Sequence, residues 1–136
     1  MNYWLVKSEP FKYSWEQFVK DKKAVWDGVR NYAARNNMRA MKKGDLVFFY
    51  HSNEGLNIVG IAKVVKEAYP DPTTEDPAWS VVEIAPFKKL KRALTLAEIK
   101  ADKKLEGIEL VRLSRLSVAA IKAHEFDRII ELSETK

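Results

Sequence analysis

The chain has 136 residues, 46% of them hydrophobic and 32% charged, which is typical of one globular domain over residues 1–136. It contains no cysteine and only two histidines, so disulfides, thiolate metal sites and cysteine nucleophiles are excluded, and we expect no metal and no cofactor. No apolar run approaches the roughly 18 residues of a membrane span, and the N-terminus lacks a signal-peptide pattern, so we expect a cytoplasmic monomer without membrane contact.

The beginning of the chain predicts a strand followed by a short helix. Residues 3–7, Tyr-Trp-Leu-Val-Lys, are apolar enough for a buried strand. Ser14 and Gln17 have the spacing of a capping box, which predicts a helix over about residues 15–20. We expect this helix to bury its two aromatic side chains.

An extended piece, a helix and a β-hairpin are predicted next. Residues 24–26 are extended and are followed by Asp-Gly, a strong turn signal. Tyr, Ala, Met and Arg recur at helical spacing over residues 31–41, which predicts a helix. Two apolar runs, residues 46–52 and 58–65, are separated by a short polar turn and are therefore predicted to pair as antiparallel strands.

The second half of the chain predicts one long strand and two further helices. Residues 69–77 contain three prolines and several acidic residues, which is typical of a surface loop. A strand is predicted over residues 79–87, and the basic run 88–92 is interpreted as a solvated loop. A second capping box predicts a short helix near residues 96–101, and an apolar face predicts a final helix over about residues 121–132.

These elements together predict the fold class. Short helices between strands that pair as hairpins favour a mixed, largely antiparallel sheet. A doubly wound sheet would need long crossover helices between parallel strands, and the sequence pattern contains none. We therefore predict an α/β fold of the α+β kind, a small curled barrel of mixed strands flanked by short helices.

Polar residues gather where the first hairpin strand ends. Along this strand Phe49 and His51 face one way and Phe48 and Tyr50 the other, and both faces are apolar up to Tyr50. Tyr50, His51 and Ser52 then bring a hydroxyl, an imidazole and a second hydroxyl in succession. A strand that only built a core would keep its polar residues on one alternating face. This strand end therefore predicts a pocket for a small, flat, hydrogen-bonding ligand.

Tryptophan and asparagine side chains supply the other groups that a base-binding pocket needs. Trp26 lies beside the Asp-Gly turn, and Asn31 stands at the start of the following helix. An indole ring offers a face for stacking, and an amide offers a donor and an acceptor that match a base edge. Trp79 follows the proline-rich loop and is a second stacking candidate. Ordinary structural roles, in the core for tryptophan and as a helix cap for Asn31, remain open.

Several blocks of sequence together resemble the EVE domain family. They extend over nearly the whole chain and occur in the family's order. The blocks are Tyr-Trp-Leu-Val-Lys-Ser-Glu-Pro at 3–10, Trp-Asp-Gly-Val-Arg-Asn-Tyr at 26–32, Phe-Phe-Tyr-His-Ser-Asn at 48–53, Ile-Val-Gly-Ile at 58–61 and Glu-Ala-Tyr-Pro-Asp-Pro-Thr at 67–73.

The resemblance implies a PUA-like pseudo-barrel, related to the YTH domains that hold a methylated adenine in an aromatic cage. It also implies a non-enzymatic module that reads a modified base, such as methylated cytosine, in DNA or RNA. Carried over by position, the residues expected in the pocket are Ser8, Trp26, Asn31, Tyr50, His51, Ser52 and Trp79.

Basic charge is concentrated in the first half of the chain. The net charge is +5, and residues 1–68 carry 12 Lys and Arg against 7 Asp and Glu, whereas residues 69–136 carry 12 of each. A basic face of this kind attracts phosphate groups. The residues expected to contact a nucleic-acid backbone are Lys7, Arg30, Arg35, Arg39, Lys42 and Lys43.

Two other functions remain open. If the first strand lies beside the hairpin, Lys7 and Glu9 would meet the pocket and, with Tyr50 or His51, could form a small hydrolase that acts on a modified nucleoside. No P-loop, nucleophile elbow or Rossmann fingerprint supports catalysis, so no catalytic residue is assigned. The other alternative is a protein-interaction module with the same fold.

Overall fold

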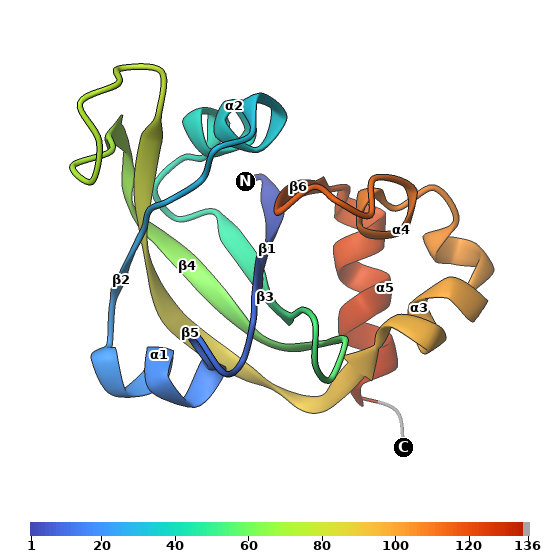
Figure 1. The fold of residues 1–136 in the computed structure, drawn as a ribbon. Coiled ribbons are helices and arrows are strands. Elements are labelled where there is room, and N and C mark those ends of the chain that lie inside the picture. The colour runs from blue at the N-terminus through green and yellow to red at the C-terminus, as the bar shows by residue number, and fades with distance from the viewer. Residues whose placement is uncertain (135–136) are drawn as a thin grey trace.

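Six strands form one curled sheet in the computed structural model, which describes residues 1–134 (Figure 1). The strands are β1 (Tyr3–Ser8), β2 (Ala24–Trp26), β3 (Leu46–His51), β4 (Asn57–Pro70), β5 (Ser80–Thr95) and β6 (Val118–Ile121). Their order in the sheet is β2-β5-β4-β3-β1-β6, so the first strand of the chain lies inside the sheet. β1 and β3 run parallel, and every other neighbouring pair is antiparallel. The predicted fold class is confirmed.

Short helices connect the strands and cover the sheet. They are α1 (Trp15–Asp21), α2 (Tyr32–Ala40), α3 (Leu96–Ala101), the 3-10 helix η1 (Lys103–Leu105), α4 (Glu109–Arg112) and α5 (Ala123–Glu134). Figure 1 shows α1 and α2 near opposite ends of the strands, and α3, α4 and α5 gathered on the side of the molecule away from β2.

Both predicted capping sites begin a helix. The hydroxyl of Ser14 accepts a hydrogen bond from the backbone N–H of Gln17 at 3.0 Å and begins α1. The Gln17 amide donates to Asp21 at 2.8 Å, so its partner is the helix end and not the cap. At α3 the capping box is complete, because Thr95 and Glu98 each bind the other's backbone N–H.

The central strand β3 packs aromatic rings on both of its faces. Phe49 stacks on Phe18 of α1 with ring centroids 5.2 Å apart, and Phe48 stacks on Phe126 of α5 at 4.9 Å. The imidazole of His51 lies 5.7 Å from the Phe49 ring, which confirms the predicted alternation along the strand. The predicted hairpin is also confirmed, because β3 pairs antiparallel with β4.

Strand β5 continues far beyond its predicted end. Residues 88–92, predicted to be a solvated loop, are part of the strand, so that prediction is wrong. Lys88 and Pro86 pair with adjacent residues of β4, which leaves Phe87 as an extra residue in a β-bulge. The bulge interrupts the alternation of side chains along β5. Leu90 is buried and holds the basic run against the core.

The predicted final helix is divided between two elements. Ile121 pairs with Tyr3 in β6, and α5 begins at Ala123. The carboxylate of Glu125 accepts a hydrogen bond from the backbone N–H of Lys122 at 2.8 Å, which satisfies a donor just before the helix. Ile121, the first apolar residue of the predicted helix, therefore belongs to strand β6.

Two kinds of feature are absent from residues 1–134. None of their helices is long and apolar enough to cross a membrane. No three of their His, Cys, Asp or Glu side chains lie together as a metal site requires.

Candidate nucleic-acid interface

The ends of β1 and β3 lie side by side, which brings together three of the predicted pocket residues. Ser8 is in register with His51, and the backbone N–H of Ser52 donates to the carbonyl of Ser8 at 2.9 Å. The hydroxyl of Ser8 donates to the carbonyl of Tyr13 at 2.6 Å and ties the strand end to the loop before α1. Because this hydroxyl uses its proton on Tyr13, it offers only acceptor lone pairs to a ligand.

Two of the predicted pocket residues have structural contacts of their own. Tyr50 is buried, and this burial raises the pKa of its phenol. Nε2 of His51 accepts a hydrogen bond from the backbone N–H of Trp15 at 3.1 Å, at the first residue of α1. Burial lowers the pKa of His51, although the nearby carboxylate of Glu16 acts in the opposite direction. An accepting Nε2 carries no proton, so His51 is neutral in this arrangement.

A cavity of about 610 Å³ lies beside β2, and Ser8 and Trp26 both line it. We call it the Trp26 cavity. The half-buried indole of Trp26 meets the ring of Tyr13 edge-on at 6.2 Å and the ring of Phe49 at 5.8 Å. Tyr13 also lines the cavity but was not among the predicted site residues. The sequence signal for Tyr13 is an aromatic residue directly before Ser14, which caps the first predicted helix.

Two lysines at the rim of the Trp26 cavity are held in ion pairs. Lys12 contacts Glu9 at 3.2 Å, and Lys23 contacts Glu83 at 2.9 Å. Glu9 is paired with Lys12, whereas Lys7 donates to Ser114, and no ion pair joins Glu9 to Lys7 in the described part of the chain.

Two aspartates at the same cavity differ in their contacts. Asp21 accepts a hydrogen bond from the hydroxyl of Tyr13 at 2.9 Å, and the pKa of Tyr13 is raised by burial and by this bond. Asp27 is exposed and forms no hydrogen bond or ion pair with another residue between 1 and 134. Its carboxylate is available to accept hydrogen bonds from a ligand.

Asn31 and Lys7 lie next to residues 113–116 and not at the Trp26 cavity. Asn31 lines a cavity of about 340 Å³ together with residues 113–116. Its side-chain oxygen accepts a hydrogen bond from the backbone N–H of Ala34 at 2.9 Å and caps α2. Nζ of Lys7 donates to the carbonyl of Ser114 at 2.7 Å, and burial lowers the pKa of the amine.

Trp79 is not among the residues that line the Trp26 cavity. Its ring stacks on Tyr32, with centroids 5.0 Å apart and planes 29° apart. The guanidinium of Arg30 lies 5.7 Å from the Trp79 ring, and that of Arg35 lies 4.9 Å from the Tyr32 ring. Tyr32 keeps 61% of its surface exposed and was also missed by the sequence prediction. The sequence feature that could have indicated Tyr32 is a large aromatic residue in the first turn of an amphipathic helix.

A buried carboxylate joins the turn after Trp26 to the loop between β4 and β5. Asp71 accepts hydrogen bonds from the backbone N–H of Gly28 at 3.1 Å and from Arg30 at 3.0 Å. It also accepts from the N–H and hydroxyl of Thr73 at 2.7 and 2.6 Å. Burial alone would raise the pKa of Asp71, but these hydrogen bonds lower it to about 2. The carboxylate therefore stays ionised and fixes the turn at the cavity.

Two further arginines of α2 bind the same loop. Arg35 donates to the carbonyl of Ala78 at 3.0 Å, and Arg39 donates to the same carbonyl at 3.1 Å and to the hydroxyl of Ser80, where β5 begins, at 3.0 Å. Their hydrogen-bond acceptors are neutral, and neither guanidinium forms an ion pair within residues 1–134. Both positive charges are thus uncompensated by a direct carboxylate partner and remain able to attract phosphate.

The two remaining predicted backbone contacts lie elsewhere. Lys42 and Lys43 precede β3, at the opposite end of that strand from His51. Their backbone N–H groups donate to Asp45 at 2.9 Å and to Glu67 at 3.1 Å. A strand the length of β3 spans about 20 Å, so a ligand at the Trp26 cavity would have to extend along the protein to reach them.

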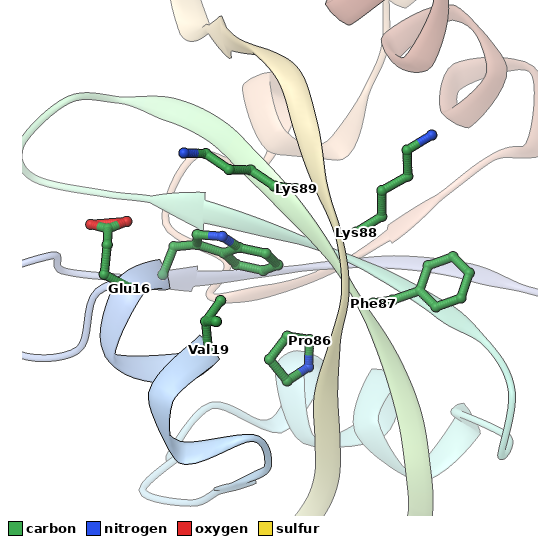
Figure 2. Close-up of a pocket in the computed structure, with 7 residues that line it drawn as sticks. Glu16, Val19, Pro86, Phe87, Lys88 and Lys89 are labelled. Atoms are coloured by element: carbon green, nitrogen blue, oxygen red, sulfur yellow. The ribbon is translucent and has the colours of Figure 1, made fainter.

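Another cavity, of about 480 Å³, lies between α1 and β5 (Figure 2). Figure 2 shows Lys89 on the same side of β5 as Glu16 and Val19, whereas Phe87 and Lys88 point to the other side of the strand. Its polar groups therefore do not converge on one point. A flat ligand that forms directed hydrogen bonds is better matched by the Trp26 cavity.

The comparisons with known proteins agree on one family. The EVE domain model matches residues 2–132. The chain is 41% identical to mouse thymocyte nuclear protein 1, with 99% of this chain and 75% of that protein covered. A protein structure from Agrobacterium tumefaciens is 46% identical with a TM-score of 0.96, covering 98% of this chain and 94% of the other.

Two similar solved structures are complexes with nucleic acid. Human THYN1 in complex with DNA that contains 5-methylcytosine has a TM-score of 0.92 and 36% identity, covering 100% of this chain and 99% of that one. The YTH domain of Zygosaccharomyces rouxii MRB1, in complex with N6-methyladenosine RNA, has a TM-score of 0.60 and 13% identity over 98% of this chain and 86% of that one. The second likeness is one of fold alone.

Proposed function

The chain belongs to the EVE domain family, and on that premise we propose that it is a non-enzymatic module that binds nucleic acid and holds one modified base in the Trp26 cavity. The observation that carries the proposal is that Ser8 and Trp26 line the same cavity as Tyr13. Two aromatic rings, a hydroxyl acceptor and a carboxylate acceptor surround one space of about 610 Å³. These are the groups by which proteins recognise an unstacked base.

Stacking supplies most of the binding energy in this proposal. A base stacked on an aromatic side chain contributes about 1–3 kcal/mol. Trp26 is held in place by edge contacts with Tyr13 and Phe49, so little side-chain freedom is lost when a base binds. A duplex would first have to release the base, which costs a few kcal/mol, so single-stranded nucleic acid is the stronger ligand.

The polar groups of the cavity supply selectivity. Asp27 accepts hydrogen bonds, and the exocyclic amine of cytosine or adenine donates them. A base without that amine would leave the carboxylate unpaired, at a cost in affinity. The complex of human THYN1 with 5-methylcytosine DNA supports a methylated cytosine as the first ligand to test.

The test is a binding panel of short single-stranded oligonucleotides that differ only in one central base. We expect the oligonucleotide with 5-methylcytosine to bind more tightly than the one with unmodified cytosine. A panel with RNA and with other methylated bases then ranks the ligands. Equal affinity for every base would exclude a reader function.

Trp26→Ala tests the position of the ligand. We expect the variant to lose about 1–3 kcal/mol of binding free energy while its melting temperature falls by less than about 10 °C. Phe87→Ala is the matched control, because Phe87 is an aromatic residue that is 55% exposed and does not line the Trp26 cavity. If Trp26→Ala binds as tightly as the wild type, the ligand does not lie on Trp26, and a fall of more than about 10 °C in its melting temperature would make Trp26 a core residue instead.

A further inference from the structure

Tyr32 is an exposed aromatic ring whose position is fixed from several directions. It is the first residue of α2, and the side chain of Asn31 caps that helix. The Tyr32 ring stacks on Trp79 and lies beside Arg35, which is itself bonded to Ala78 and to Asn36. In spite of these contacts 61% of Tyr32 is exposed. A large ring that is both rigid and exposed is suited to stacking against a flat ligand.

The Tyr32 ring is physically connected to the Trp26 cavity. Asp27 lines the cavity, and only four residues lie between it and Tyr32 along the chain, a span of at most about 18 Å. Asp71 fixes this segment through Gly28 and Arg30. The guanidinium of Arg30 also lies over Trp79, the stacking partner of Tyr32. The two aromatic sites are therefore joined by a short segment that Asp71 and Arg30 hold in place.

Charge at this second site favours nucleic acid. Arg35 and Arg39 contact only neutral acceptors within residues 1–134, so the ring is flanked by cations without direct carboxylate partners. The phosphates on either side of a stacked base need such cations nearby. An acidic peptide would also be attracted by these cations, but the stacked pair of rings would not contribute to binding it.

We infer that Tyr32, supported by Trp79 and Arg35, is the stacking site for an unmodified base that neighbours the base held at Trp26. This inference rests on the proposed function of the Trp26 cavity. The base at Tyr32 is recognised by its flat face and not by its edge, so the site accepts any of the four bases. Tyr32 thus adds affinity for a polymer over a free nucleoside, whereas the Trp26 cavity adds selectivity for the modification.

The experiment compares two single-stranded trinucleotides with 5-methylcytosine at the centre. In one, both flanking positions carry bases; in the other, both are abasic. We expect Tyr32→Ala to weaken binding of the first by about five- to one-hundred-fold and to leave the second unchanged. Tyr32→Phe keeps the ring and should bind both like the wild type. Trp26→Ala should weaken both.

The outcomes separate the two proposals. Equal weakening of both trinucleotides by Tyr32→Ala, or no weakening of either, overturns a flanking-base site at Tyr32. The same pair is also measured with unmodified cytosine at the centre. If the wild type does not distinguish methylated from unmodified cytosine, the reader function fails. The stacking site is still supported in that case if Tyr32→Ala weakens binding only of the trinucleotide whose flanking positions carry bases. A wild type that binds no trinucleotide overturns both.

Discussion

Nε2 of His51 accepts a hydrogen bond from the backbone N–H of Trp15, so the end of strand β3 caps the start of helix α1. The first N–H groups of a helix have no partner within the helix. Ser14 satisfies the N–H of Gln17, and His51 satisfies that of Trp15. The histidine thereby joins helix α1 to strand β3 of the sheet.

This contact predicts that stability falls in mild acid. The bond needs an unprotonated Nε2, and burial lowers the folded-state pKa of His51 below its unfolded value of about 6.5. The unfolded chain therefore takes up the proton first, so the stability from this group is complete above about pH 6.5 and decreases as the pH falls below that value. Urea midpoints at about pH 7.5 and about pH 5.5 measure the effect.

His51→Gln should reduce that pH dependence, because glutamine does not titrate. His124→Gln is the matched control, since His124 is exposed on α5. We expect the control to keep the wild-type difference between the two midpoints. If His51→Gln keeps it as well, the acid sensitivity arises from another group.

Gly60 predicts a second effect on stability. A Cβ atom built on Gly60 would lie 2.5 Å from Cη2 of Trp15, far inside van der Waals contact. Trp15 is buried and packs on Phe49, so the indole has little room to move. Gly60→Ala should therefore reduce the free energy of unfolding by about 1–3 kcal/mol, measured by urea denaturation.

The cause is tested by a double-mutant cycle with Trp15→Phe, which removes the part of the indole that would clash. We expect the alanine at position 60 to cost less in the Trp15→Phe background. Additive losses in the double variant would mean that the alanine acts through the backbone and not through the ring.

Asp27 predicts which bases the Trp26 cavity prefers. Its carboxylate is exposed and has no partner within the described chain, so Asp27→Ala should leave the melting temperature unchanged. Thymine carries the same ring methyl group as 5-methylcytosine but has an acceptor oxygen where cytosine has its amine. The wild type should therefore prefer 5-methylcytosine to thymine in otherwise identical oligonucleotides. Asp27→Ala should bind the two alike, and a preference that survives the substitution would rule out this carboxylate as the reader of the amine.

Salt should weaken binding to an oligonucleotide. A small basic domain that makes about two to four phosphate contacts on a single strand loses affinity with a log–log slope of about −0.7 per contact. Arg39→Gln should make this slope shallower by about one contact, because Arg39 lies beside the Tyr32–Trp79 site without an ion pair in the described chain. Lys100→Gln, on α3 and away from both aromatic sites, should leave the slope unchanged. A free nucleoside should show no such slope, and a salt-independent oligonucleotide affinity would argue against backbone contact.

Local patterns in the sequence were sufficient for most of the secondary structure. The hydroxyls of Ser14 and Thr95 begin helices where the cap spacing places them. The β3–β4 hairpin follows from two apolar runs and a short polar turn. Residues 88–92 were misassigned, because a bulge at Phe87 shifts the alternation and the exposed lysines of a strand look like those of a loop.

The site was harder to predict, because its contacts join distant parts of the chain. Ser8 and Trp26 were predicted and share a cavity, yet Asp27 was considered only as a turn residue. The partner of His51 is 36 residues away, and nothing local to the histidine indicates a helix cap. Tyr32 was missed because its stacking partner, Trp79, becomes adjacent only when the β4–β5 loop folds over α2.

The place of β1 inside the sheet has a consequence for how the protein is made. β1 is synthesised long before β6, yet its neighbours in the sheet are β3 and β6, and Tyr3 pairs with Ile121. The two β1 ladders therefore close only after most of the polypeptide has been synthesised. Such long-range pairing slows folding and leaves the apolar β1 segment exposed to aggregation in the meantime. We expect nascent chains that stop before β6 to depend on chaperones, whereas chains released after it fold unaided.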